Sequence, residues 1–212
     1  MISKPVASGF SRTSGPPKGE HPIGCETAYD RDGLVDHIEI APYDPAWATA
    51  FEAERDRLAQ ALGSLARRID HNGSTSVVGL DAKPVIDIQI SVDALNPLDA
   101  YGRPLSVLGY THVPDPDDAV CPFFHRPEAW PHTHHVHVVS HGGAEERRTL
   151  AFRDYLRDHA DVMHAYASPK HQLARYYAAA DNAAREAFAD GKTEFIEHVI
   201  QLALAAGYPH SS

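Results

Sequence analysis

The chain has 212 residues, 43% of them hydrophobic and 23% charged, which is the composition of an ordinary soluble globular domain. A formal net charge of −10 argues against broad nucleic-acid binding, because that function needs a basic surface. Two cysteines without CxxC spacing indicate neither a disulfide framework nor a zinc–thiolate site.

The first 33 residues are poor in large apolar side chains and rich in Gly, Pro, Ser and charge. Such a segment buries too little apolar surface to offset its ordering entropy. We therefore expect a flexible extension over 1–33, followed by one domain over 34–208. The sequence shows neither an apolar run long enough to span a membrane nor a secretory signal, so we expect a cytoplasmic protein without membrane contact.

The domain opens with a predicted strand over 34–40 and a helix that starts at Asp44-Pro45, with Asp44 as the N-cap. Gly63 is the expected stop of this helix. Several residues between them recur at helical spacing, and we expect their apolar members to face the core. These residues are Trp47, Ala50, Phe51, Glu54, Leu58 and Leu62.

A strand is predicted over 85–92 because this stretch is apolar, β-branched and too short for a typical helix. In a strand, Asp87 and Gln89 point to one face, while the isoleucines between them point to the other. The small residues Gly73, Ser74 and Thr75 lie just upstream. Their backbone N–H groups and hydroxyls can hold a phosphate while the Asp87 carboxylate holds Mg²⁺.

The middle of the chain predicts a short helix over 97–108 and strands over 109–113 and 123–126. A further strand is expected from His132 to Val139. Its alternation places His135, His137 and Val139 on one face, and His132 and His134 on the other. The first set faces the same side as the Asp87 carboxylate if the two strands are neighbours in register.

From residue 145 onward the pattern becomes helical. We expect helices over 145–159 and 161–166, a new start at Ser168-Pro169, and a long helix over 170–189. Asp190-Gly191 predicts a break before a last helix over 193–205. Strands first and helices last indicate an α+β domain, with helices packed on one side of a mixed sheet.

Four motifs in order resemble the GrpB family, a branch of the nucleotidyltransferase superfamily, over about residues 36–205. They are Gly73-Ser74-Thr75 with Gly79-Leu80, Ala82-Lys83-Pro84 with Ile86-Asp87-Ile88, His135-Val136-His137-Val138-Val139, and Phe152-Arg153-Asp154-Tyr155-Leu156-Arg157. The resemblance implies a nucleotidyltransferase-like mixed β-sheet with a helical C-terminal part. Asn72 and Val78 depart from the family pattern.

The resemblance also implies a nucleotide such as ATP and a divalent metal as cofactors. Asp87 matches the first carboxylate of the superfamily, but Gln89 stands where a second one is usual, and an amide is a poor ligand for Mg²⁺. With Gln89 in the metal set, His135 and His137 are the remaining metal ligands, which would favour Mn²⁺ or Zn²⁺ over Mg²⁺. Alternatively the two histidines are acid–base or phosphate-contacting groups with a single Mg²⁺ on Asp87, or they are a structural or solvated pair.

Four basic residues match family positions that contact phosphate or line the pocket, namely Lys83, Arg153, Lys170 and Lys192. Lys83 precedes the strand that carries Asp87, and the others belong to the helical part. Arg153 has an equally plausible structural reading, an ordinary ion pair with Asp154.

The main functional hypothesis is a protein that binds a nucleotide or another phosphorylated small molecule. Its catalytic form would carry out metal-dependent nucleotidyl or phosphoryl transfer, or ATP-dependent activation of a small molecule, with Asp87, His135 and His137 as catalytic residues. The first alternative is a non-catalytic nucleotide-binding module, which Gln89 favours. The second is a histidine-based metalloenzyme without a nucleotide.

Overall fold

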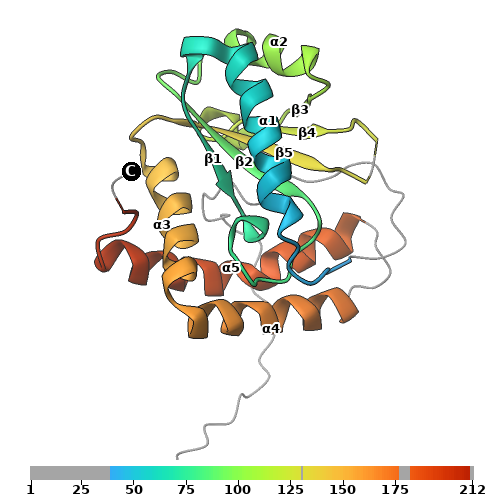
Figure 1. Cartoon of the computed structure of the whole chain (residues 1–212), viewed down its shortest axis with the longest axis vertical. Helices are drawn as coiled ribbons and strands as arrows, with labels where there is room; N and C mark the ends of the chain where they lie inside the picture. Colours follow the sequence, from blue (N-terminus) through green and yellow to red (C-terminus); the bar gives the residue numbers. More distant parts are fainter. Residues whose placement is uncertain (1–38, 130, 177–181, 211–212) are drawn as a thin grey trace, which may run out of the picture.

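The computed structural model describes residues 39–129, 131–176 and 182–210 (Figure 1). The predicted extension over 1–33 lies outside these residues, as does most of the strand predicted over 34–40. Glu39 and Ile40 belong to no strand. Ala41 instead forms an isolated antiparallel bridge with Ala82, which ties the start of the domain to the loop before the Asp87 strand.

The sheet has five strands in the order β1-β2-β5-β4-β3. Strands β2 and β5 are parallel and the other neighbours are antiparallel, so the sheet is mixed. The bounds are β1 Ala66–Asn72, β2 Ile86–Val92, β3 Thr111–Val113, β4 Phe123–Arg126 and β5 His134–Ser140. Strand β1 was not predicted, because ARRIDHN carries more charged and polar residues than apolar ones.

Helix α1 spans Ala46–Leu62 and confirms the predicted helix and its end signals. The Asp44 carboxylate accepts a hydrogen bond from the Ala46 N–H at 2.8 Å. Gly63 follows the helix with φ of +53°, a backbone conformation that glycine adopts at little cost. The buried side chains of the helix lie on one stripe, as predicted: Trp47, Phe51, Glu54, Leu58 and Leu62.

Helices cover both faces of the sheet. Helix α1 and helix α2 (Asp99–Val107) pack against Ile86, Ile88 and Ile90 of β2, which are at most 4% exposed. The other helices are α3 (Ala144–Asp158), α4 (Ala160–Tyr176) and α5 (Asn182–Ala205), and they share a second core cluster. In Figure 1, α1 crosses in front of the strands, while α3, α4 and α5 form a separate group lower in the view.

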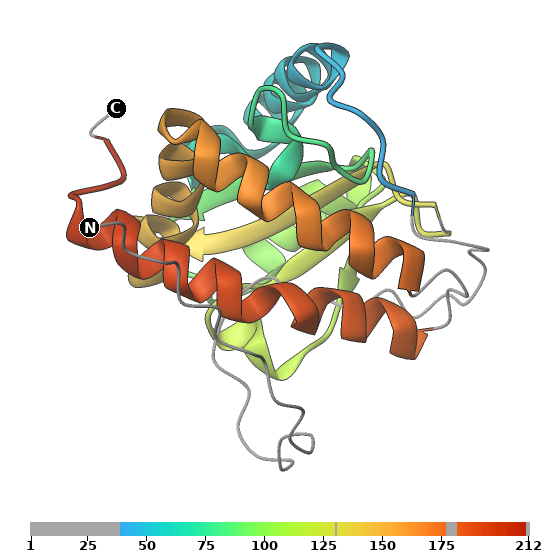
Figure 2. The same cartoon turned by 90° about the horizontal axis from the view of Figure 1, so that it is seen from below.

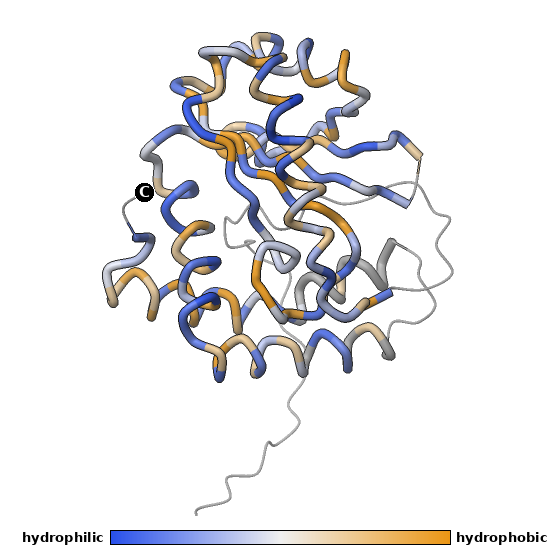
Figure 3. The backbone as a smooth tube through the Cα atoms, in the orientation of Figure 1, coloured by the Kyte–Doolittle hydropathy of each residue, from blue (hydrophilic) through white to orange (hydrophobic). Residues whose placement is uncertain are grey.

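The mixed α+β sheet and the helical C-terminal part are confirmed, but the expectation of helices on one side only is wrong. The face of β2 that carries the polar side chains is buried as well. Gln89 and Ser91 are 0% exposed, and Thr149 of α3 donates a hydrogen bond to Gln89. Figure 3 shows the hydrophobic stretch at the centre of the sheet.

Two predicted helix breaks are absent. Helix α4 runs through Ser168-Pro169, and α5 runs through Asp190-Gly191. Tertiary packing of an apolar face overrides weak local stop signals. In this fold Met163 and Tyr166 of α4 pack with Ile196 of α5 in the second cluster, and Figure 2 shows the two helices side by side.

Three short 3₁₀ turns complete the described fold: Gly63–Leu65, Ser74–Ser76 and Pro116–Ala119. The last of these lies in the loop predicted over 114–122. A search of the described helices for a segment both long and apolar enough to cross a membrane finds none.

Candidate functional site

Strands β2 and β5 bring Asp87 and the two histidines together, as predicted. Asp87 pairs with His135 and Gln89 pairs with His137 in the parallel register, so these side chains share one face. His135 Nδ1 lies 3.3 Å from Asp87 Oδ1. Burial would raise the pKa of Asp87, but the hydrogen bond with His135 and the electrostatic interactions with His135, His137 and Lys83 hold it below its usual value.

The Gly73 turn packs directly on the Asp87 carboxyl group. Gly73 has φ of +63°, and a Cβ atom at this position would lie 2.7 Å from Asp87 Cγ. Only glycine allows both the backbone conformation and this close approach. The predicted neighbourhood of a Gly-Ser turn and a strand-borne carboxylate is therefore present, with Ser74 partly exposed at the start of the turn.

Thr75 has a structural position instead of the predicted phosphate contact. Its side chain is buried, and its hydroxyl donates to the Val85 carbonyl at 3.1 Å. The same Oγ1 lies 3.1 Å from His71 Nε2. These bonds join the turn to the loop before β2.

Gln89 does not fit a metal ligand, which corrects that assignment. Its Oε1 atom accepts hydrogen bonds from Thr149 Oγ1 at 2.5 Å and Asn72 Nδ2 at 3.4 Å. Its Nε2 atom is buried without a hydrogen-bond partner, and an amide nitrogen donates hydrogen bonds instead of binding cations. The sheet thus offers a single carboxylate here, and among the described residues no group of three or more His, Cys, Asp or Glu is arranged to hold a metal ion.

His137 is a neutral ring at the inner end of this face. Burial, partly offset by Asp87, lowers the pKa of His137 to about 4. The ring lies 5.0 Å from the Phe123 ring, and its Nδ1 is 3.9 Å from the sulfur of Cys121.

Two further histidines, His132 and His125, extend the site. The alternation of side chains expected along the strand does not place them there. His132 Nδ1 lies 3.3 Å from His135 Nε2, and the His132 ring stacks on His125 with 3.8 Å between centroids. His132 was expected on the opposite face from His135. Strand β5 begins only at His134, so the alternation of side chains does not extend back to His132. His134 itself takes the predicted opposite face, where its Nδ1 lies 3.2 Å from Arg126 Nη2.

Three predicted lysines converge on the same region from separate segments. Lys170 is 3% exposed, with Nζ 5.0 Å from the centre of the Tyr166 ring and bonded to the Asp81 carbonyl. Burial, and next the positive charge of Lys192, lower the pKa of Lys170 to about 7. The Asp81 and Asp87 carboxylates oppose that change and Lys83 adds to it. The charges of Lys83, Lys192 and Asp87 therefore all act on Lys170.

Arg153 lies apart from these lysines and has the structural role that was the alternative reading. It is 8% exposed, and its guanidinium bonds to Asp154 at 2.7 Å, Asp70 at 3.3 Å and the His71 carbonyl at 3.1 Å. These bonds hold α3 against β1. The ion pair with Asp154 that was the alternative reading is present, and a phosphate contact of Arg153 stays a prediction.

Comparisons with known proteins agree with this fold. The family model described as GrpB protein matches residues 37–202. The UPF0157 protein PA4798 of Pseudomonas aeruginosa is 40% identical over 174 residues, which cover 81% of this chain and 69% of that protein. A dephospho-CoA kinase of Mycobacterium bovis is 31% identical over 172 residues, which cover 66% of this chain and 42% of the kinase.

Among solved structures, the conserved protein GrpB from Enterococcus faecalis has a TM-score of 0.69 and 29% sequence identity. The match covers 79% of this chain and 98% of that one. The resemblance inferred from the four motifs is thereby confirmed, and the chain belongs to the GrpB family.

Proposed function

We propose that this protein binds a phosphorylated small molecule, with nucleotides as the first candidates, beside the Asp87 face of the sheet. The electrostatic interaction of Lys170 with both Lys192 and Lys83 carries this proposal. After burial, these two positive charges contribute to the pKa of about 7 for Lys170, a low value for a lysine. An anion placed among the three would offset these charges.

The chemistry of the surrounding groups suits a phosphate. Ammonium groups and backbone N–H groups are common phosphate donors, and the Gly73 turn supplies backbone close to Asp87. A ligand bound there would meet Lys83 on the loop before β2, while Lys170 and Lys192 would reach it from α4 and α5.

Binding is expected without a bound metal, because the donor atoms do not fit one. Asp87 provides one carboxylate, Gln89 has its oxygen engaged, and the ring of His137 is already close to Cys121. A divalent metal remains a prediction from the family resemblance. Titrations with Mg²⁺, with Mn²⁺ and with chelator therefore test it separately from ligand binding.

A second candidate is phosphoryl or nucleotidyl transfer at the same place, which the contact between Asp87 and His135 favours. A carboxylate that orients an imidazole ring is a recurrent arrangement for general acid–base catalysis. His132 on the other ring nitrogen of His135 would extend it into a path for a proton. In such a reaction the chain of Asp87, His135 and His132 would take up the proton of an acceptor hydroxyl as that oxygen attacks phosphorus. The bond from phosphorus to the leaving oxygen would break at the same time, and pyrophosphate or a nucleoside diphosphate would leave.

The test is a calorimetric titration of the full chain with ATP, GTP, CTP, UTP and dephospho-CoA. Dephospho-CoA is included because a dephospho-CoA kinase is among the relatives. We expect saturable binding of at least one compound in the presence of chelator. The absence of binding for all five, with and without Mg²⁺ or Mn²⁺, would contradict the proposal. Turnover of the bound compound with candidate acceptors, lost in His135→Asn with binding retained, would support the second candidate.

A further inference from the structure

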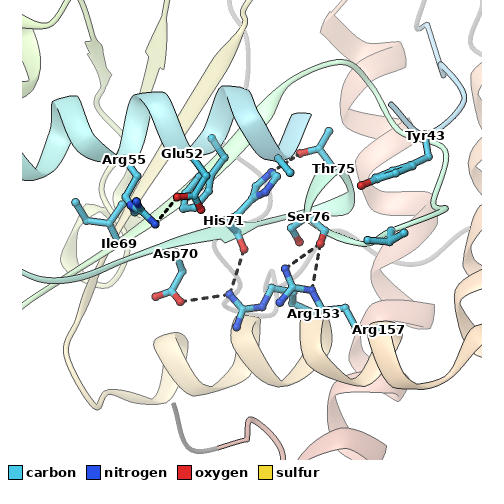
Figure 4. A pocket seen from close by; sticks show the side chains of 13 residues that line it. Tyr43, Glu52, Arg55, Ile69, Asp70, His71, Thr75, Ser76, Arg153 and Arg157 are labelled. Carbon is cyan, nitrogen blue, oxygen red and sulfur yellow. Dashed lines mark hydrogen bonds and ion pairs between the residues drawn. The ribbon is translucent and has the colours of Figure 1, made fainter. Parts of the chain in front are cut away.

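A separate cavity of about 610 Å³ lies along the outer edge of β1. Helix α1 forms one wall, α3 forms the other, and β1 with the turn after it forms the floor (Figure 4). Small-molecule sites usually have volumes of about 300–1,000 Å³, so the cavity has the size for one compact ligand. Strand β1 is the edge of the sheet, which leaves this side open between the two helices.

This cavity is distinct from the site around Asp87. Its lining includes none of Asp87, His135, His137 or the three lysines, and the predicted site residues it does include are Thr75 and Arg153. His71 shows the separation: it pairs with Ile88, and its ring stacks on Phe51 of α1 at 4.7 Å, on the apolar face of the sheet. A ligand in this cavity would therefore contact a different set of residues from a ligand beside Asp87.

The charges at the cavity leave a cation incompletely compensated. Arg157 donates hydrogen bonds to the Ser76 carbonyl at 2.9 and 3.1 Å. Its ion pair with Asp154 spans 3.5 Å, and that carboxylate already accepts a hydrogen bond from Arg153 at 2.7 Å. Burial, and next the charge of Arg153, lower the pKa of Arg157. The lining contains three arginines and two carboxylates, and Arg153 and Arg157 share the single further carboxylate of Asp154.

The rest of the lining suits a flat apolar group. The stacked rings of Phe51 and His71 are nearly parallel, at 9°. Tyr43 and Ile69 add apolar surface, and Figure 4 shows Tyr43 at one end of the cavity, with Arg153 and Arg157 below the turn. Burial lowers the pKa of His71 to about 4, so this ring is uncharged at neutral pH and presents an aromatic surface.

We propose that the β1-edge cavity is a second ligand site, which binds a small aromatic compound carrying one oxyanion group, a carboxylate or a phosphate monoester. Arg157 binds the oxyanion, because planar guanidinium groups form paired hydrogen bonds with such oxygens. The aromatic body lies along Phe51 and His71. This site is independent of the phosphate site proposed above.

The experiment is a ¹H–¹⁵N NMR titration of the full chain with phenyl phosphate, benzoate and inorganic phosphate. Two variants alter the cavity. Ala48→Trp fills it from an exposed position on α1 without removing a hydrogen bond. Arg157→Gln removes the proposed anion donor. Arg147→Gln is the matched control, since Arg147 is exposed on the same helix and outside the cavity.

We expect saturable shifts at Phe51, Ile69 and Ser76 with phenyl phosphate or benzoate, and the better of the two identifies the oxyanion. Arg157→Gln should weaken this binding roughly 10-fold, the loss expected for one charge-assisted contact. Ala48→Trp should abolish it while leaving any ATP binding as in the wild type. No saturable shift with any probe up to about 10 mM, or shifts that Ala48→Trp leaves unchanged, would overturn the second site.

Discussion

His135 Nδ1 lies 3.3 Å from Asp87 Oδ1, across two parallel strands that come from parts of the chain almost fifty residues apart. The pair joins the Gly73 turn to the histidine-rich strand β5. His135 also contacts His132, and Asp87 also contacts Gly73. A substitution of His135 or Asp87 therefore affects the neighbouring groups on the same face of the sheet. The predictions below address the parts of this arrangement separately.

Replacing Asp87 with Asn should remove a stabilising contribution that depends on pH. The pKa of Asp87 is lower in the folded than in the unfolded chain, so the carboxylate stabilises the fold above its unfolded pKa of about 4. This contribution is lost as pH falls through the folded pKa. Urea unfolding from pH 7 to pH 3 should therefore show a constant deficit for Asp87→Asn above about pH 4 that shrinks below it. Asp93→Asn, at an exposed position, is the control.

His71 should make the protein less stable in mild acid. Its pKa is lowered from 6.5 to about 4, mainly by burial. Between these pH values the unfolded chain binds a proton at His71 and the folded chain does not. Stability then falls as pH decreases from 6.5 to 4. His71→Phe keeps the stacking on Phe51. It should reduce the loss of unfolding free energy between pH 6.5 and pH 4 by on the order of 2 to 3 kcal/mol. His164→Gln, an exposed position on α4, should leave the slope unchanged.

Gly73→Ala should destabilise the chain more than the same change at another glycine of similar backbone conformation. Both Gly73 and Gly142 have positive φ, of +63° and +69°. Nothing lies within 4 Å of a Cβ at Gly142, whereas one at Gly73 meets Asp87. We expect Gly142→Ala to lower the free energy of unfolding by about 1 kcal/mol, and Gly73→Ala to lower it by about 1–3 kcal/mol more. Equal losses of unfolding free energy would show that the turn does not press on the carboxyl group.

The bond from Thr149 to Gln89 should behave as a buried polar pair. Thr149→Val removes the donor and should cost about 1–3 kcal/mol, because it leaves a buried amide oxygen short of a partner. Adding Gln89→Met should recover part of this loss, since both polar partners are then gone. The coupling is measured by urea unfolding of the two single variants and the double variant. If the losses of unfolding free energy in the two single variants simply add in the double variant, the hydrogen bond between Thr149 and Gln89 is contradicted.

The sequence was sufficient for those parts of the fold where one signal dominates. Strand β2 follows from its β-branched run, and α1 from its apolar stripe between Asp44 and Gly63. It was insufficient for β1, whose charged residues pair with Arg153 and other side chains after folding. The helix breaks predicted at Pro169 and Gly191 are absent, because the packing of α4 against α5 outweighs local helix propensity.

The candidate site shows the same limit. Alternation along the strands placed Asp87, His135 and His137 on one face correctly, because the parallel register preserves it. Alternation says nothing about His132, which precedes the strand, or about Thr149, whose contact with Gln89 depends on how α3 docks. No sequence pattern indicates the β1-edge cavity either, because its walls come from two helices about a hundred residues apart in the chain.

The measurement that tests the central claim most directly is calorimetric titration of the tightest phosphorylated ligand into Lys170→Met and Lys192→Met. Methionine fills the space of the lysine stem, so the buried site on α4 should remain folded. We expect each variant to lose at least roughly 10-fold in affinity, as for the loss of a charge-assisted phosphate contact. Arg103→Met, at an exposed position on α2, should bind as the wild type does. Unchanged affinity in both lysine variants would contradict a phosphate site beside Asp87.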